Sequence, residues 1–268
     1  MRTGSGPGVT RAWRGGAAGT GVRAVLAPNP GPMTLEGTNT WVLRAPGPAP
    51  GGGAVVVDPG PAGVPQHLAV VHEVAGPVAL TLLTHHHRDH TGAVAEWTAL
   101  TGSAVRGADS DSPLREGERI QAAGWNLEVL ATPGHTADSV CLLIPEEGVL
   151  LTGDTVLGRG TSVVPWPEGH LGDYLDSLTR LISLAREGVV RTIAPGHGPV
   201  VTEPLDFLNA LLAHRRERLD QVSAAVRAGA RTASEVVTAV YGDLGETLAR
   251  AATATVRAQL AHLGHDPA

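Results

Sequence analysis

Histidine and aspartate residues gather in short segments that lie beside glycine or proline and directly after apolar runs. The segments are THHHRDHTG (84–92), TPGHT (132–136), TGDT (152–155) and PGHGP (195–199). Neutral imidazole is a good ligand for zinc, and a carboxylate compensates the charge of the cation. Glycine and proline in such loops allow ligands to approach one point closely. The pattern therefore indicates a metal site assembled from loops that are distant along the chain.

The first segment is the densest, with four potential ligands in six residues. His85 and His87 are two residues apart, so in an extended chain their side chains point the same way. Asp89 and His90 follow after a turn. His86 lies between the first two, and its side chain is expected to point away from the metals. A polar loop of solvated histidines would explain this segment alone, but the further segments make that interpretation the weaker one.

The elements that must position these segments are indicated by hydrophobic periodicity and by turn residues. Strands are expected within residues 22–45 (strand, turn, strand), 54–60, 77–84, 102–107, 117–131, 139–154 and 189–195. Helices are expected at residues 64–75, 91–100 and 171–187, and then at 203–227, 232–243 and 245–265. Strand runs separated by helices favour an α/β layered domain with the histidines on loops at strand ends.

The predicted domain organisation has three parts: a disordered tail at 1–21, a catalytic domain at 22–205 and a helical domain at 206–268. The tail is Gly-rich and lacks the apolar core of a secretory signal, and no apolar run reaches the length of a membrane span. Cys141, the single cysteine, lies in the run VCLLI and is expected to be a buried strand residue. A thiolate-rich zinc site is therefore excluded, and a cytoplasmic location fits.

The composition excludes several other kinds of chemistry. Lysine is absent from the 268 residues, which excludes a Schiff base and a P-loop lysine. The net charge of −6 argues against a broadly basic nucleic-acid-binding surface. Aromatic residues make up 3% of the chain, so platforms for stacking bases would be few. A hydrophobic fraction of 42% is enough for a sizeable core.

The order HxHxDH, GH, GD and GH resembles the metal-binding signature of the metallo-beta-lactamase fold superfamily. The resemblance implies a four-layer αββα sandwich that binds two zinc ions, with other divalent metals as alternatives. It assigns His85, His87 and His135 to the first metal, Asp89, His90 and His197 to the second, and Asp154 to both. Two cations about 3.5–4 Å apart repel each other, so a bridging anion is needed. Asp154 and a bridging hydroxide would supply it, and Asp89 is also the implied catalytic residue.

True beta-lactamases generally have a cysteine where Asp154 stands, and this departure argues against antibiotic hydrolysis. Longer segments resemble the beta-lactamase-like protein 2 family, among them NPGPMTLEGTNTWVL (29–43), TPGHTADS (132–139), LTGDTVLGRGTSV (151–163) and APGHGPV (194–200). The HRRER segment (214–218) and the helices after it are similar to that family's small winged-helix domain. The strand pair that would form the wing looks truncated here. This resemblance implies an endoribonuclease that cleaves single-stranded RNA.

Three hypotheses follow for the function. The first is an RNA phosphodiesterase that uses a metal-bridging hydroxide, with Arg159, Thr161 and Arg215 as substrate contacts. A solvated helix face is the alternative explanation for HRRER. The second is a thioester or lactone hydrolase of the glyoxalase II kind, which would use the same ligands. The third is a nucleic-acid-binding regulator with a vestigial metal site, and the intact ligand set argues against it. Monomer and homodimer both remain open.

Two further expectations concern residues outside the ligand set. Asp58, in VVVDPG, is expected either to orient a metal-binding histidine through a hydrogen bond or to be an ordinary turn residue. The remaining histidines are expected at the solvated surface: His67, His72, His170, His214, His262 and His265.

Overall fold

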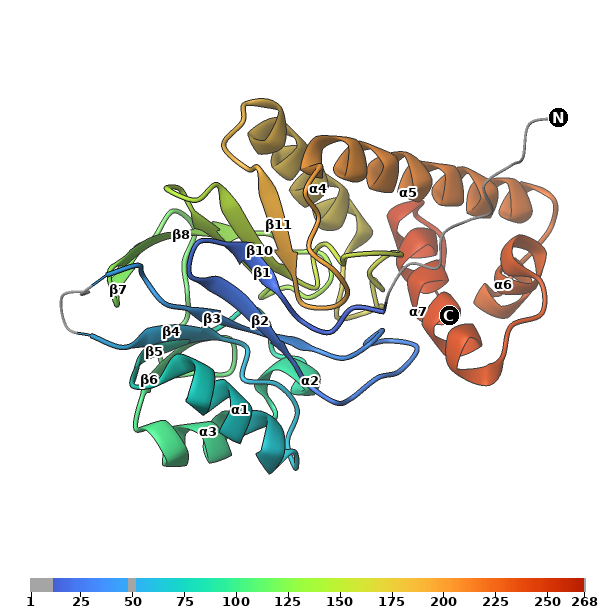
Figure 1. Ribbon diagram of the computed structural model, residues 1–268. Helices are drawn as coiled ribbons and strands as arrows, with labels where there is room; N and C mark the ends of the chain where they lie inside the picture. The colour runs from blue at the N-terminus through green and yellow to red at the C-terminus, as the bar shows by residue number, and fades with distance from the viewer. Residues whose placement is uncertain (1–11, 48–51, 268) are drawn as a thin grey trace, which may run out of the picture.

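Short apolar runs form two β-sheets that pack face to face in the computed structural model, which describes residues 12–47 and 52–267 (Figure 1). The first sheet contains, in spatial order, β1 (Ala17–Gly19), β2 (Val22–Leu26), β3 (Asn39–Leu43), β4 (Ala54–Val57), β5 (Val78–Leu83) and β6 (Ala104–Gly107). The second contains β11 (Thr192–Pro195), β10 (Val149–Gly153), β9 (Val140–Ile144), β8 (Trp125–Ala131) and β7 (Arg119–Ala122).

Helices cover the outer faces of both sheets (Figure 1). The first sheet carries α1 (Pro65–Ala75) and α3 (Val94–Thr101), and the one-turn α2 (Arg88–Thr91) lies near its edge. The second sheet carries α4 (Leu171–Arg186) and the start of α5 (Pro204–Arg227), followed by α6 (Ala233–Tyr241) and α7 (Glu246–His262). The four-layer αββα sandwich predicted from the sequence is therefore confirmed.

The sequence pattern of the strands follows from these layers. A central core lies between the sheets and includes Trp41, Leu82, Leu127 and Leu151. Strands covered on both faces bury every residue, as β3, β4, β9 and β10 do, and β4 and β9 are apolar throughout for this reason. Cys141 lies buried in β9, as predicted. The helices instead show apolar residues at intervals of three and four, as expected for elements buried along one stripe.

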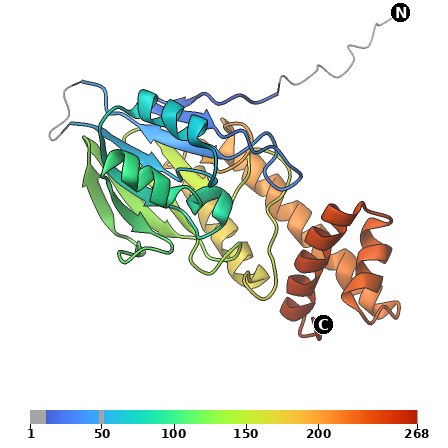
Figure 2. The ribbon, with the colours of Figure 1, turned by 90° about the horizontal axis from the view of Figure 1, so that it is seen from below.

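The chain after residue 203 is helical, as predicted. The first half of α5 packs against α4 through Leu208 and Leu212, and its end packs through Val222 against α6 and α7. The predicted boundary at 205/206 falls in the first turn of α5. Residues 204–267 contain no strand, so no wing accompanies these helices and the winged-helix likeness stays a prediction. Figure 2 shows α6 and α7 at one end of the sandwich.

The predicted disordered tail at 1–21 is wrong for its last part, and residues 1–11 lie outside the described residues. Ala17–Gly19 forms β1, which pairs antiparallel with β2. Trp13 also donates a hydrogen bond from Nε1 to Asn39 Oδ1 at 2.8 Å. A Gly-rich segment has no periodicity of its own, and here the edge of β2 supplies the hydrogen-bonding partners that order it.

None of the helices in the described residues has the length and the apolar character that a membrane span requires.

Trp97→Ala is expected to lower the free energy of unfolding by about 3–5 kcal/mol. Trp97 is fully buried between α3 and the first sheet, and its Nε1 donates to Thr81 Oγ1 at 3.0 Å. The substitution therefore leaves a cavity and removes one of the two hydrogen bonds of the buried Thr81 hydroxyl, which keeps Ser103 Oγ at 2.9 Å. Urea titration followed by circular dichroism measures the change. Leu100→Ala is the matched control, because Leu100 lies on the same helix but is 50% exposed. Equal losses in both variants would contradict the prediction.

Candidate metal centre

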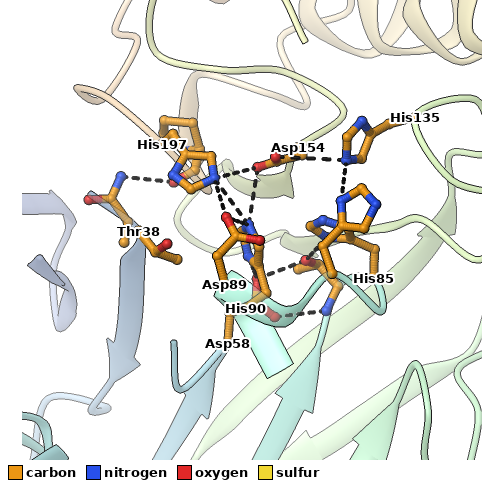
Figure 3. A network of polar contacts seen from close by, with 12 residues as sticks. Thr38, Asp58, His85, Asp89, His90, His135, Asp154 and His197 are labelled. Carbon is orange, nitrogen blue, oxygen red and sulfur yellow. Dashed lines mark hydrogen bonds and ion pairs between the residues drawn. The ribbon is translucent and has the colours of Figure 1, made fainter. Parts of the chain in front are cut away.

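The four predicted segments follow directly after the carboxyl ends of β5, β8, β10 and β11. Strand β9 is antiparallel to β8 and to β10, and β10 is parallel to β11. The strands β8, β10 and β11 therefore run in one direction, and their carboxyl ends lie at one edge of the second sheet. Figure 3 shows the side chains from these loops pointing toward one another. The prediction that the histidines lie on loops at strand ends is confirmed for His85, His87, His135 and His197, whereas His90 lies in the one-turn helix α2 just after β5.

Three histidines from two of these loops form the first group. The ligand atoms of His85, His87 and His135 lie within 4.8 Å of one another. His87 Nδ1 is 3.0 Å from His135 Nε2. Two nitrogens bound to one zinc at 2.0–2.1 Å in tetrahedral geometry are about 3.3 Å apart. The spacing of this group therefore matches that of ligands around a single cation.

The second group combines a carboxylate with two histidines. The ligand atoms of Asp89, His90 and His197 also lie within 4.8 Å of one another. His90 Nε2 is 3.2 Å from His197 Nε2, which is 3.1 Å from Asp89 Oδ2. Both histidines are fully buried, whereas the Asp89 side chain is 28% exposed. Asp89 is thus the member of this group with most access to solvent.

Asp154 lies between the two groups (Figure 3). Its Oδ1 is 3.3 Å from His90 Nε2 and 3.4 Å from His197 Nε2. Its Oδ2 is 3.7 Å from His135 Nε2. The structure therefore brings together every residue predicted as a metal ligand, and it places the carboxylate assigned to both metals between the others.

Asp58 orients two of the histidines. Its Oδ2 accepts hydrogen bonds from Thr84 Oγ1 at 2.7 Å and from His90 Nδ1 at 2.9 Å, and its Oδ1 accepts from the Thr84 amide at 2.9 Å. Thr84 Oγ1 is in turn 3.0 Å from His85 Nδ1. Because a carboxylate only accepts, His90 carries its proton on Nδ1 and turns the Nε2 lone pair toward the cluster. Of the two expectations for Asp58, the orienting role is confirmed.

Backbone carbonyls fix two further histidines in the same way. His135 Nδ1 donates to the carbonyl of Val163 at 2.6 Å, and His197 Nδ1 donates to the carbonyl of Gly37 at 3.1 Å. In both rings Nε2 therefore faces the cluster, and in the neutral ring its lone pair is available to a cation. Carbonyl partners of this kind carry no signal in the sequence, because every residue offers one.

The cluster is buried and carries negative charge. Burial opposes protonation of His197, but the carboxylates of Asp154 and Asp89 outweigh it and raise the pKa of His197 to about 9. Burial likewise opposes protonation of His90, yet Asp154 and Asp58 raise its pKa well above its ordinary value. Burial would raise the pKa of Asp154, but His197 and His90 hold it well below its usual range. The carboxylates thus stabilise positive charge within the cluster.

His86 points away from the cluster, as predicted. Its Nδ1 is 2.9 Å from Asp138 Oδ1, and its Nε2 contacts Glu168. Glu168 Oε1 is also 3.1 Å from His87 Nε2, so this carboxylate holds the ring nitrogen that faces away from the first group. Sequence analysis missed Glu168, since a single glutamate in a loop has no distinguishing pattern.

His67 does not lie at the solvated surface, so the prediction is wrong for this histidine. It is 3% exposed, and its Nε2 lies 2.8 Å from Thr40 Oγ1. Burial lowers the pKa of His67 to about 4, so the ring is neutral at pH 7. Its partner comes from β3, which is distant from it along the chain, and the local sequence therefore gave no sign of the contact.

The GTNTW segment (37–41) holds the loop that carries His197. Asn39, fully buried, donates from Nδ2 to the carbonyls of Pro195 at 3.0 Å and Gly198 at 2.9 Å. Trp41 Nε1 donates to the same Pro195 carbonyl at 3.0 Å. Together with the Gly37 carbonyl, these groups fix both the backbone around His197 and the rotation of its ring.

The GRGTS segment (158–162) contacts both groups of ligands from another side. The amide of Gly158 donates to the carbonyl of His197 at 2.8 Å, and Ser162 Oγ lies 3.2 Å from His135 Nδ1. A Cβ at Gly158 would lie 2.0 Å from the carbonyl oxygen of Pro199, so only glycine allows this approach. Arg159 forms an ion pair with Glu36 at 2.6 Å.

Arg215 is not on a solvated helix face, so that alternative for the HRRER segment is wrong at this position. The residue is 5% exposed, and its guanidinium lies 4.8 Å from the ring centre of Tyr174. Its Nη2 contacts the carbonyl of Ser162. The helical region therefore packs directly on the GRGTS segment and, through it, on the surroundings of His135.

A cavity of about 560 Å³ opens onto the cluster. Four of the predicted ligands line it: His87, Asp89, His135 and Asp154. All three predicted substrate contacts, Arg159, Thr161 and Arg215, also line it, together with residues of α5, α6 and α7. Their role as substrate contacts stays a prediction.

The layered fold and the His/Asp cluster at its strand ends define a class of metal-binding proteins. The chain belongs to the metallo-beta-lactamase superfamily, whose sequence profile matches residues 33–113 and 99–197. Members of this superfamily are generally hydrolytic metalloenzymes. The chain is 31% identical over 224 residues to a beta-lactamase-like protein 2 homologue of Drosophila melanogaster, covering 74% of this chain and 71% of that protein.

Solved structures agree with this assignment. The metallo-beta-lactamase family protein TTHA1429 from Thermus thermophilus superposes with a TM-score of 0.75 and 25% identity, covering 91% of this chain and 93% of that one. TTHA1623, solved in a di-iron-bound form, gives a TM-score of 0.53 and 26% identity, covering 68% of this chain and 96% of that one.

Proposed function

We propose that the protein is a dinuclear zinc-dependent hydrolase. The observation that carries the proposal is a pair of buried atoms, His85 Nε2 and Asp154 Oδ1, which have no hydrogen-bond partner although they lie within the cluster. Buried polar atoms are otherwise almost always paired. Ring nitrogens turned inward by outer hydrogen bonds, next to carboxylates that favour positive charge, fit metal ions.

The division of ligands follows the two groups. His85, His87 and His135 would hold one ion, Asp89, His90 and His197 the other, and Asp154 would contact both. Nitrogen and oxygen donors suit zinc, and they also suit iron, which the di-iron form of TTHA1623 makes the alternative. When bound, zinc supplies a Lewis acid and lowers the pKa of a coordinated water to about 7.

Asp89 is the residue of this chain best placed to move a proton. Its carboxylate belongs to the cluster and lines the cavity as well. Burial would raise the pKa of Asp89, but the hydrogen bond from His197 and the charge of His90 lower it. Asp89 is therefore ionised at neutral pH and can accept the proton of the attacking water. The reaction then breaks an ester-type bond in the substrate and releases a protonated leaving group.

A carboxylic thioester fits the cavity better than RNA does. A volume of about 560 Å³ lies in the range of small-molecule sites, roughly 300–1,000 Å³. Hydrolysis would join the water oxygen to the carbonyl carbon, break the carbon–sulfur bond and release a carboxylate and a thiol. The acidic chain, with net charge −6, also favours a small substrate.

Single-stranded RNA is the second candidate. It is supported by the likeness to beta-lactamase-like protein 2 homologues and by the arginines that line the cavity, Arg159, Arg215 and Arg218. Arg159 and Arg218 each have a partner, Glu36 and Gln221, but a guanidinium has five N–H donors, so both could contact phosphates as well. The cavity volume and the acidic charge of the chain place RNA behind the thioester.

The test combines metal analysis with turnover. Fresh protein should contain close to two equivalents of a transition metal, measured by mass spectrometry, and the zinc-loaded protein should hydrolyse acyl thioesters. Asp89→Ala should reduce the turnover on the order of 10³-fold, whereas Asp111→Ala, at an exposed loop aspartate, should not. Cleavage of labelled RNA without thioester turnover would contradict the thioesterase and support RNA as the substrate. Protein without any bound transition metal would contradict both.

A further inference from the structure

The cavity has a polar floor and largely apolar walls. The floor consists of the exposed parts of the candidate metal ligands. One wall comes from the loop before β3 and contains Met33 and Leu35, and the other comes from the C-terminal helices and contains Tyr241, Leu244 and Leu248. Two segments more than 200 positions apart in the numbering, at 33–35 and 241–248, thus line one space with apolar side chains.

Two of these side chains are unusually exposed. Met33 is 44% exposed and Leu248 is 50% exposed, and only Val70 and Leu100 are comparable among the large apolar residues that the structure describes. Single exposed apolar residues are normal and need no explanation. Here, however, two of the four line the cavity that ends at the cluster. Apolar surface gathered in a concave site is typical of ligand binding.

Helix α7 holds its part of the wall rigidly. Leu248, Ala252 and Thr255 line the cavity at spacings of four and three, which places them on one face of the helix. Val256 and Leu260 lie on another face and are buried in the cluster that joins α5, α6 and α7. The small side chain of Ala252 leaves room beside Leu248 for an apolar group.

Each arginine that lines the cavity has a partner within the protein, although Arg215 Nε has none. Arg218 donates to Gln221 Oε1 at 2.7 Å, and its guanidinium lies 5.0 Å from the ring centre of Tyr241. The pKa of His214 is lowered by burial and by the charges of Arg218 and Arg215, so His214 is mainly neutral at pH 7. The lining of the cavity as a whole is more apolar than polar.

We propose that this cavity binds the hydrophobic acyl chain of a thioester between Met33 and Leu248, with the thioester carbonyl at the metal centre. The proposal rests on the proposed function and names its substrate class. Acyl-chain length should then set the specificity, because each methylene that enters the cavity adds apolar contact. The expected gain in kcat/KM is about fourfold for each buried methylene.

The experiment uses the full-length, zinc-loaded protein and a series of acyl thioesters of one small thiol, from acetyl to octanoyl. In the unmodified protein kcat/KM should rise along the series, mainly through KM. Leu248→Asn should flatten the rise, with a larger loss for octanoyl than for acetyl thioester, and Met33→Asn should act similarly from the other wall. Leu100→Asn is the matched control, because Leu100 is equally exposed but does not line the cavity. It should retain the full chain-length dependence.

A binding measurement separates this proposal from the proposed function. Calorimetric titration with butanoate, hexanoate and octanoate reports on the apolar walls even if no thioester is hydrolysed. Tighter binding of longer chains that is lost in Leu248→Asn supports the acyl site. Turnover or binding that is independent of chain length, or equally affected by Leu100→Asn, would overturn it and leave the hydrolase intact. Length-dependent binding without any thioester turnover would contradict the proposed hydrolase function but support the acyl-binding site.

Discussion

Asp154→Asn is expected to lower kcat/KM for hydrolysis on the order of 10³-fold, because one charge is lost where two cations must be held together. Asparagine has the same shape, so the packing around residue 154 is preserved. The carboxylate of Asp154 is 3.3 Å and 3.4 Å from His90 Nε2 and His197 Nε2 on one side and 3.7 Å from His135 Nε2 on the other, so it lies between the two ligand groups. Two cations about 3.5–4 Å apart would then repel each other without a shared anion.

Metal content distinguishes this effect from simple unfolding. The variant should retain the circular dichroism of the unmodified protein but bind at most one equivalent of zinc. Asp176→Asn is the matched control, because Asp176 lies exposed on α4 and the substitution removes the same charge. A variant with two tightly bound metals and nearly full activity would show that Asp154 does not bridge the ions.

The fold could be predicted from the sequence to a large extent because its elements have strong periodic signals. The amphipathic α4 buries Leu171, Tyr174 and Leu178 at intervals of three and four, and the apolar runs of β9 and β10 are covered on both faces. The strand β1 gave no such signal. Its residues pair only because β2 presents a free edge, and that edge exists only after the sheet has formed.

The candidate ligands could be predicted because their residue types and order are characteristic. The groups that orient them were harder to predict. Asp58 was recognisable as a possible orienting carboxylate, whereas the carbonyls of Gly37 and Val163 were not, because backbone groups have no residue type. Two further misjudgements concern burial. Arg215 packs against Tyr174 and His67 lies beneath the surface, although both residues are of kinds that usually face water.

A residue of the GTNTW segment can be changed to test how the loop that carries His197 is held, while the candidate ligands themselves stay unchanged. Asn39→Asp replaces two amide donors with acceptors that face the carbonyls of Pro195 and Gly198. The carbonyl of Gly198 would lose its side-chain donor, the carbonyl of Pro195 would keep only Trp41 Nε1, and a buried carboxylate would face both. The loop that carries His197 would then shift, while His85, His87 and His135 keep their own supports. The group that contains His197 should therefore lose metal affinity, while the group of His85, His87 and His135 should keep it.

We expect Asn39→Asp to reduce zinc affinity at the group that contains His197 by about 10–100-fold, with a similar loss of activity. Zinc titration of the metal-free protein should show one tight site and one weakened site, and Asn209→Asp, at an exposed position on α5, should leave both tight. Loss of both sites together would mean that the groups are not independent. Two sites of unchanged affinity would mean that the loop does not need the Asn39 side chain, since Trp41 Nε1 donates to the same Pro195 carbonyl and the Gly158 amide donates to the His197 carbonyl.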